Sequence, residues 1–174
     1  DGYVGRINQS SWSNARANTT GTVVNSTASN NSLAVRADKL SGRGGSVIYN
    51  IYRSFFFFDT SGISANVGSA TFKVRGAFNG GGDLIAVKSN SDILTLGTAD
   101  FGSIVGWNTT TDGSGGGDNE SNVTKYSAEI STWSTSGYND ITLNAQALAD
   151  MRDDDKVYIL SLIHISEPTR LGMI

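Results

Sequence analysis

The pattern of hydrophobic and polar positions predicts many short strands. The clearest is Val47 to Phe58, VIYNIYRSFFFF, which is rich in β-branched and aromatic residues and ends at the turn-forming residues 59–62. Apolar residues occupy both faces of this segment, so we expect a central strand that is covered by a layer on each side. A single open sheet cannot provide that cover, which favours two packed sheets.

The two strands expected next differ from it. In residues 70–76 the apolar side chains, including Phe72 and Val74, alternate with polar ones, which is the period-two pattern of a half-exposed strand. A further strand is expected over residues 83–89. The glycine-rich segment 79–82 between them gives positive φ at little steric cost. The sequence therefore predicts an antiparallel hairpin of these two strands.

The remaining pattern completes a sandwich. Shorter strands are expected before this region at 2–7, 21–25 and 32–37, and after it at 104–107, 125–130, 140–143 and 156–159. Asn144 is a candidate N-cap for about two helical turns. The predicted fold class is all-β: a two-sheet β-sandwich, jelly-roll-like in its connections, with one short helix near residues 145–153.

Composition and charge narrow the partners. The chain has 174 residues, enough for one domain, and its formal net charge is -3 with scattered lysines and arginines. Without a basic stripe we expect no nucleic acid partner. No apolar run reaches membrane-spanning length, so no membrane insertion is expected. The absence of cysteine excludes disulfides and thiolate metal sites.

The last fifteen residues resemble something other than natural protein. Leu160 to Arg170 reads LSLIHISEPTR, which resembles the translation of a sequencing-library adapter, and the last four residues fit its continuation. We therefore interpret residues 1–159 as a sandwich module truncated at its C-terminus and residues 160–174 as an adapter-derived tail. The single histidine, His164, lies in this tail and is assigned no role. The tail is β-prone and can extend the strand at 156–159.

The chemistry of the chain argues against an enzyme. Outside the tail there is no histidine, no cysteine, no phosphate-binding glycine motif and no Gly-x-Ser-x-Gly elbow. The common nucleophile–base pairs and nucleotide-binding loops therefore cannot be built. A glycosidase that uses a pair of carboxylates stays open as a distant alternative, because such an enzyme needs only two acids facing one another.

One acidic loop is a candidate calcium site. Residues 112–120 combine flexible glycines with the oxygen donors of Asp112, Asp118 and Glu120, which suit a hard cation. The loop is not an EF-hand, and a solvated hairpin tip explains the same residues. The acidic run 153–155 is a second, weaker cation candidate. Calcium is thus the only cofactor that the sequence suggests.

Four aromatic residues are candidate sugar contacts. Flat apolar rings with polar neighbours suit the stacking of sugar rings. Core packing is the alternative explanation for each of them. Trp107 and Trp133 are favoured because polar, loop-like residues follow each one. The candidates for a ligand-binding platform are Trp12, Trp107, Trp133 and Tyr138.

Three segments resemble a known group of domains. Arg53 to Ile63, RSFFFFDTSGI, and Gly68 to Val74, GSATFKV, resemble the core motif of carbohydrate-binding-module-like jelly rolls, including DNRLRE-type domains and phage structural proteins. The segment 138–144, YNDITLN, resembles their late strand. The resemblance implies a non-catalytic sandwich module of an extracellular, cell-surface or virion protein.

Two functions follow from these expectations. The first is a glycan-binding or adhesion module with a polysaccharide ligand. The second is a phage or surface structural protein that acts through assembly contacts with a neighbouring structural protein. The glycosidase is third.

Overall fold

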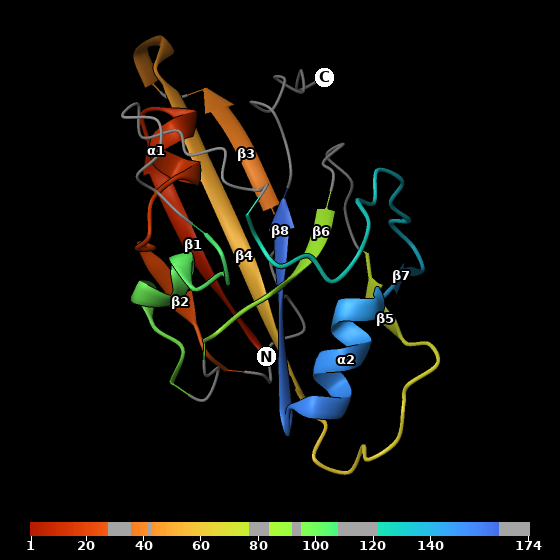
Figure 1. Ribbon diagram of the computed structural model, residues 1–174. Coiled ribbons are helices and arrows are strands. Elements are labelled where there is room, and N and C mark those ends of the chain that lie inside the picture. Colours follow the sequence, from red (N-terminus) through yellow and green to blue (C-terminus); the bar gives the residue numbers. More distant parts are fainter. Residues whose placement is uncertain (28–35, 42, 77–83, 92–94, 108–121, 164–174) are drawn as a thin grey trace.

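The computed structural model describes residues 1–27, 36–41, 43–76, 84–91, 95–107 and 122–163. It is an all-β sandwich of two antiparallel sheets, as the hydrophobic pattern predicted (Figure 1). The strands are β1 (Gly2–Gln9), β2 (Val23–Asn25), β3 (Arg36–Ser41), β4 (Val47–Asp59), β5 (Thr71–Arg75), β6 (Leu84–Lys88), β7 (Tyr138–Thr142) and β8 (Lys156–Ile163), and the helical segments are α1 (Trp12–Arg16), η1 (Arg43–Gly45), η3 (Thr98–Gly102) and α2 (Ala145–Asp153).

The larger sheet is built around β4. Its order is β2-β1-β4-β8-β6, with β3 paired to β4 in addition. β4 is 13 residues long, so its first half pairs with β3 and its last residues pair with β8. Because β1 occupies the opposite side of β4, β3 and β8 follow one another along the same side. The prediction of a central strand at this position is confirmed.

Both faces of the larger sheet are covered. Along β4, Phe55 packs into one core and Phe56 into the other, since successive side chains of a strand point to opposite faces. The first core is closed by residues of α1 and η3, including Ala15 and Phe101. The second core is closed by the smaller sheet and α2. Its buried members are Phe56, Phe72, Leu84, Ala86, Tyr126, Ile141, Leu143, Ala147, Val157 and Ile159.

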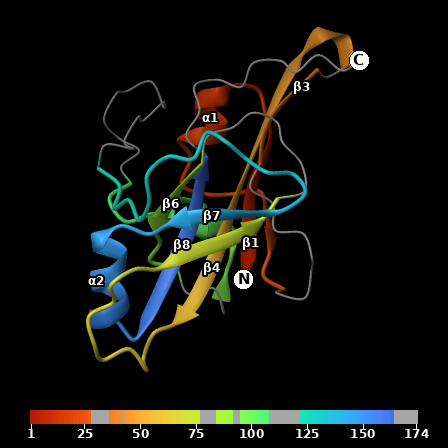
Figure 2. The same ribbon diagram turned by 90° about the vertical axis from the view of Figure 1, so that its right-hand side faces the viewer.

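The smaller sheet consists of β5 and β7, which run across the larger sheet in Figure 2. The predicted hairpin between residues 70–76 and 83–89 is wrong, because β5 pairs with β7 whereas β6 pairs with β8 in the larger sheet. The physical reason lies in burial. Residues 84–87 of β6 are buried on both faces, which requires a strand inside a covered sheet, whereas β5 keeps one polar face in solvent.

Some shorter elements also differ from expectation. Residues 104–107 and 125–130 form isolated bridges rather than strands. The strand expected at 32–37 is seen as β3 from Arg36 to Ser41, and residues 32–35 lie outside the described residues. A second helix, α1, was not expected. Its N-cap Ser11 accepts a hydrogen bond from Asn14 N at 3.2 Å.

The C-terminal elements follow the prediction. Asn144 is the N-cap of α2, and its side chain accepts from Ala147 N at 3.1 Å. β8 continues beyond residue 159 to Ile163, so the β-prone start of the tail lengthens the last strand. Leu160 and Leu162 are both buried in the first core. These tail residues therefore contribute directly to packing.

The side chains of Asp59, Thr60 and Ser61 fix the turn that follows β4. The carboxylate of Asp59 accepts from Ser61 N at 3.0 Å and from Ser61 Oγ at 2.6 Å, and these bonds lower the pKa of Asp59. Thr60 is buried, and its backbone N donates to Asp155 O at 3.0 Å. Its hydroxyl donates to Asp154 O. The Asp-Thr-Ser sequence thus joins the end of β4 to the connection between α2 and β8.

Candidate functional site

The four aromatic candidates lie on two sides of the larger sheet. Trp12 and Trp107 pack against the first core, and Trp133 packs against the second. Tyr138 belongs to β7 and is 67 % exposed. The structure therefore brings Trp133 and Tyr138 to the same side and separates them from the other two.

Trp107 contacts the core through a buried arginine. The guanidinium carbon of Arg53 lies 4.0 Å from the ring centroid of Phe101 and 4.9 Å from that of Trp107. Arg53 also donates to the backbone oxygens of Phe101 and, at 3.0 Å, of Arg16. Its side chain is 1 % exposed. The position of Trp107 is thus explained by cation–π packing in the interior.

Trp12 has a similar environment. Its ring centroid lies 6.1 Å from that of Tyr49, and the planes are tilted by 54°. The indole nitrogens of both Trp12 and Trp107 are buried and lack a hydrogen-bond partner within the described residues. Both rings are half-buried against the first core, so packing explains their placement without a ligand, and their role as sugar contacts stays a prediction.

The solvent face of the smaller sheet presents Tyr138 among polar side chains. Register pairs Arg75 with Tyr138, Lys73 with Asp140 and Thr71 with Thr142, and all six of these side chains are exposed. We call this surface the β5–β7 outer face, made up of Thr71, Lys73, Arg75, Tyr138, Asp140 and Thr142. In Figure 2 the two strands lie in front of the larger sheet. The six side chains of the outer face are exposed, whereas the alternate residues Phe72, Asn139 and Ile141 are buried.

The loop before Tyr138 is held by a buried asparagine. Asn139 Oδ1 accepts from Ser134 N at 2.7 Å, and its Nδ2 donates to Ser134 O at 3.0 Å and to Val74 O at 3.3 Å. These bonds satisfy backbone groups of both the loop and β5. Asn139 is thereby the residue that fixes how the chain enters β7 and where Tyr138 starts.

A close backbone approach adds to this constraint. A Cβ at Gly76 would overlap Ser134 O and the indole nitrogen of Trp133, so only glycine fits there. Gly76 N also donates to Gly137 O at 3.1 Å. Trp133 thus covers the end of β5 next to Arg75, and the loop geometry that presents Tyr138 is rigidly specified.

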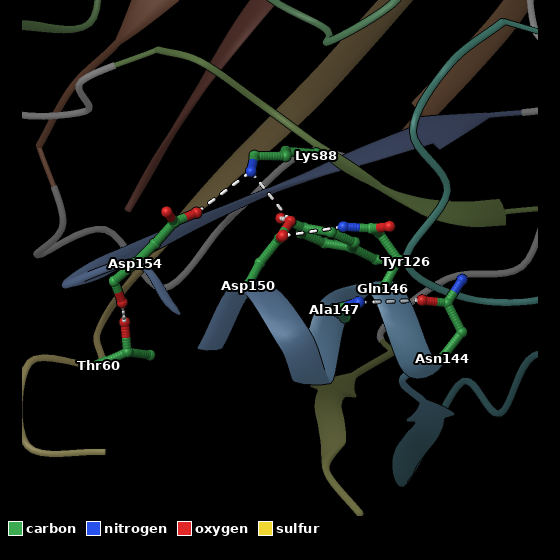
Figure 3. Close-up of polar contacts among 8 residues, drawn as sticks. All are labelled: Thr60, Lys88, Tyr126, Asn144, Gln146, Ala147, Asp150 and Asp154. Carbon is green, nitrogen blue, oxygen red and sulfur yellow. Dashed lines mark hydrogen bonds and ion pairs between the residues drawn. The ribbon is translucent and has the colours of Figure 1, made fainter. Parts of the chain in front are cut away.

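A second polar cluster lies between α2, β6 and the segment at Tyr126 (Figure 3). Asp150 Oδ2 accepts from Lys88 Nζ at 2.9 Å and from Tyr126 Oη at 2.6 Å, and its Oδ1 accepts from Gln146 Nε2 at 2.9 Å. Lys88 also contacts Asp154 Oδ2 at 3.2 Å. Two carboxylates therefore converge, but on a shared lysine.

The pKa shifts of this cluster favour a fixed ion pair. Burial alone would raise the pKa of Asp150, but hydrogen bonds from Tyr126, Lys88 and Gln146 outweigh it, and the pKa is lowered. Burial and the bond to Asp150 raise the pKa of Tyr126. A carboxyl that acts as a general acid needs a raised pKa, and a tyrosine that acts as a general base needs a lowered pKa. Both groups are shifted in the other direction. The cluster is therefore suited to holding α2 in place.

The cation candidates fall in two regions. Asp112, Asp118 and Glu120 lie outside the described residues. In the acidic run 153–155, Asp153 forms an ion pair with Arg152 at 2.6 Å, and Asp154 contacts Lys88. Among the residues that the structure describes, no three acidic or histidine side chains gather in a way that could hold a metal ion.

A small cavity of about 140 Å³ lies between α2 and the two sheets. Its volume is below the roughly 300 Å³ at which ligand pockets usually begin, and its lining is apolar. It is a small, half-open hollow at the edge of the second core, since exposed Phe58 and Thr71 contribute to its lining. The lining residues are Phe58, Ala70, Thr71, Phe72, Leu143, Met151 and Ile159.

Sequence reasoning placed Tyr138 among the ligand candidates but missed its neighbours. The alternation in β5 predicted that Lys73 and Arg75 face solvent, yet only the pairing of β5 with β7 brings them beside Tyr138.

Within the described part of the chain, no helix has the length and apolar character needed to cross a membrane. Comparison of the chain with protein-family models, curated proteins and solved structures found no match.

Proposed function

We propose that this chain is a non-catalytic glycan-binding module, located on an extracellular, cell or virion surface, and that its ligand lies on the β5–β7 outer face. The observation that carries the proposal is the exposure of Tyr138, which is 67 %, on a regular sheet surface with charged and hydroxyl neighbours. An exposed ring provides a stacking surface for a pyranose, and the surrounding polar groups can bind its hydroxyls.

The rigidity of this surface supports the proposal. The side chain of Asn139 and the close approach at Gly76 fix the loop, and β-pairing fixes the spacing of the polar residues. Preorganised side chains lose little conformational entropy on binding. Such a face suits a weak, repeated interaction with a polysaccharide better than a deep pocket would.

The proposal is tested by glycan titration. The full chain would be screened on a broad glycan panel and the hits titrated by calorimetry, with Tyr138→Ala as the test variant. We expect about a ten-fold loss of affinity, equal to about 1.4 kcal/mol, from removal of the stacking ring. Val24→Ala is the control, because Val24 is 41 % exposed on β2, in the other sheet from Tyr138. Absence of any glycan binding by the wild-type chain would refute the proposal.

Assembly with a neighbouring structural protein is the second candidate. The β3–β4 hairpin extends beyond the rest of the sandwich in Figure 2. Near its tip, Leu40 and Val47 are 46 % and 38 % exposed. Exposed apolar side chains on a projecting edge are typical of association sites. Sedimentation over a concentration series tests this: wild type should self-associate, and Leu40→Asp should stay monomeric. A wild-type chain that remains monomeric up to millimolar concentration would exclude self-assembly.

A further inference from the structure

We infer that the ligand of the β5–β7 outer face is an acidic oligosaccharide whose carboxylate is bound by Arg75. This inference rests on the proposed function and adds the chemical class of the ligand. It is carried by the juxtaposition of the exposed Tyr138 with the guanidinium of Arg75, which has no partner among the residues that the structure describes.

Arg75 is the basic group directly opposite the stacking ring. β-Sheet register pairs Arg75 with Tyr138, and both side chains lie on the solvent face. Cross-strand neighbours of this kind have Cβ atoms about 5 Å apart. Within the part of the chain that the structure describes, the Arg75 side chain forms no hydrogen bond or ion pair. Its five donors are therefore available to a ligand that stacks on Tyr138.

The guanidinium favours a carboxylate on that ligand. Its planar fork matches the two oxygens of a carboxylate and binds them through parallel hydrogen bonds. A single neutral hydroxyl offers one oxygen and no charge, so it accepts a weaker bond from the guanidinium than a carboxylate does. A sugar that carries a carboxylate next to its stacked ring would satisfy Tyr138 and Arg75 together.

The neighbouring ion pair supplies the next contacts. Lys73 Nζ lies 3.3 Å from Asp140 Oδ2, and both side chains are 58 % exposed. A pair this exposed is weak and opens at little cost. Asp140 can then accept from sugar hydroxyls while Lys73 approaches a second acidic unit. Along the strands these groups lie about 7 Å from the Arg75–Tyr138 pair, which suits a short chain of sugars.

Charge distinguishes this surface from the rest of the protein. Lys73, Arg75 and Asp140 give the face a local charge of +1, whereas the whole chain carries -3. Binding of a nucleic acid backbone would require many more cations in a stripe. One available arginine and one loosely paired lysine are matched instead to an isolated carboxylate on a sugar.

The experiment compares two forms of one ligand. A uronic-acid oligosaccharide and its methyl ester share the same sugar backbone, but only the first is charged. Each would be titrated into the full chain at low and at high salt. We expect at least ten-fold tighter binding of the acid, and we expect this preference to shrink in 1 M salt, where screening acts within about 3 Å.

The variants assign the preference to its residue. Arg75→Gln should reduce the preference for the acid about ten-fold and leave the affinity for the ester unchanged. Arg75→Lys should keep part of the preference, because charge remains while the fork is lost. Arg152→Gln is the matched control, since Arg152 is an exposed arginine already paired with Asp153. Thermal melts of all variants check that the fold is retained.

The outcomes separate the inference from the proposed function. Stronger binding of the acid that depends on Arg75 supports both. Equal binding of acid and ester, lost in Tyr138→Ala, refutes the acidic ligand and leaves glycan binding intact. A preference for the acid that survives in Arg75→Gln refutes the assignment to Arg75. Binding of neither oligosaccharide, nor of any other glycan on the panel, refutes both.

Discussion

Replacement of Arg53 by methionine tests how the first core is held together. Arg53 stacks between Phe101 and Trp107 and donates to two backbone oxygens, those of Phe101 and Arg16. A methionine of similar length keeps the apolar contacts of the side-chain stem. It removes the charge and both hydrogen bonds, so two interior carbonyl groups lose a donor.

The expected loss of stability is about 2–4 kcal/mol. Each hydrogen bond to a charged group contributes roughly 1.5–3 kcal/mol, and a desolvated cation–π contact contributes about 2 kcal/mol. Against these stands the desolvation of the buried guanidinium, which costs several kcal/mol and disappears with the charge. The favourable interactions of Arg53 and the cost of its desolvation nearly cancel. The variant is therefore expected to be less stable mainly because two backbone carbonyl groups lose their hydrogen bond from Arg53.

Urea unfolding and thermal melts measure this difference. For a domain of this size the loss corresponds to a fall in Tm of about 5–15 °C. The Tm of Arg53→Lys should lie between those of wild type and Arg53→Met, because lysine keeps the charge but not the planar guanidinium. Arg152→Met, on the exposed side of α2, should change stability by less than about 0.5 kcal/mol. If Arg53→Met is as stable as wild type or more stable, desolvation dominates and our reasoning is refuted.

Four further substitutions test other parts of the structure. Asn139→Ala removes three hydrogen bonds of the loop before β7, so we expect a loss of about 1–3 kcal/mol in urea unfolding together with weaker glycan binding; unchanged binding would contradict its positioning role. Gly76→Ala forces a Cβ against Ser134 O and should cost about 1–3 kcal/mol, and a neutral result would show that the loop can move. Leu160→Ala should cost about 2–5 kcal/mol in thermal melts, because this leucine is fully buried, and a loss under 1 kcal/mol would argue that β8 ends earlier. Asp150→Asn should make the free energy of unfolding less dependent on pH in acid. The lowered pKa of Asp150 stabilises the folded state above the ordinary pKa of 3.8, and this contribution is lost as the pH falls through the pKa of the folded state. Wild type should therefore lose more stability than the variant between about pH 4 and pH 2. An identical acid limb in both proteins would contradict this linkage.

The elements that the sequence predicted well are those that burial specifies. The two-faced apolar run became β4, and the alternating run became β5 with Phe72 inward and Lys73 outward. Asn144 was identified as a cap because a side-chain acceptor at a helix start has a local signature. In each case neighbouring residues carry enough information to determine the structure.

Pairing could not be predicted in the same way. The glycine-rich segment 79–82 suggested a hairpin, yet β5 and β6, the strands before and after it, belong to different sheets. β5 and β6 each pair with a strand that lies far along the sequence, β7 and β8 respectively. These pairings bury apolar side chains of distant segments together, which a local sequence pattern does not reveal. The site shares this dependence, because Arg75 and Tyr138 are 63 positions apart and meet only through β5–β7 pairing.

The residues of the segment from Arg53 to Thr60 serve the interior and the turn of this fold. Arg53, Phe55 and Phe56 are buried in the cores, and Asp59 and Thr60 fix the turn to the α2–β8 connection. Substitution at these positions changes stability, so selection for folding alone can maintain them. The outward positions of β5 and β7 are under no such packing constraint. A sandwich with the same interior can therefore acquire a different ligand by changing the residues opposite Tyr138, and a graft of Lys73, Arg75, Tyr138 and Asp140 onto a related sandwich should transfer the preference for an acidic sugar without altering its core.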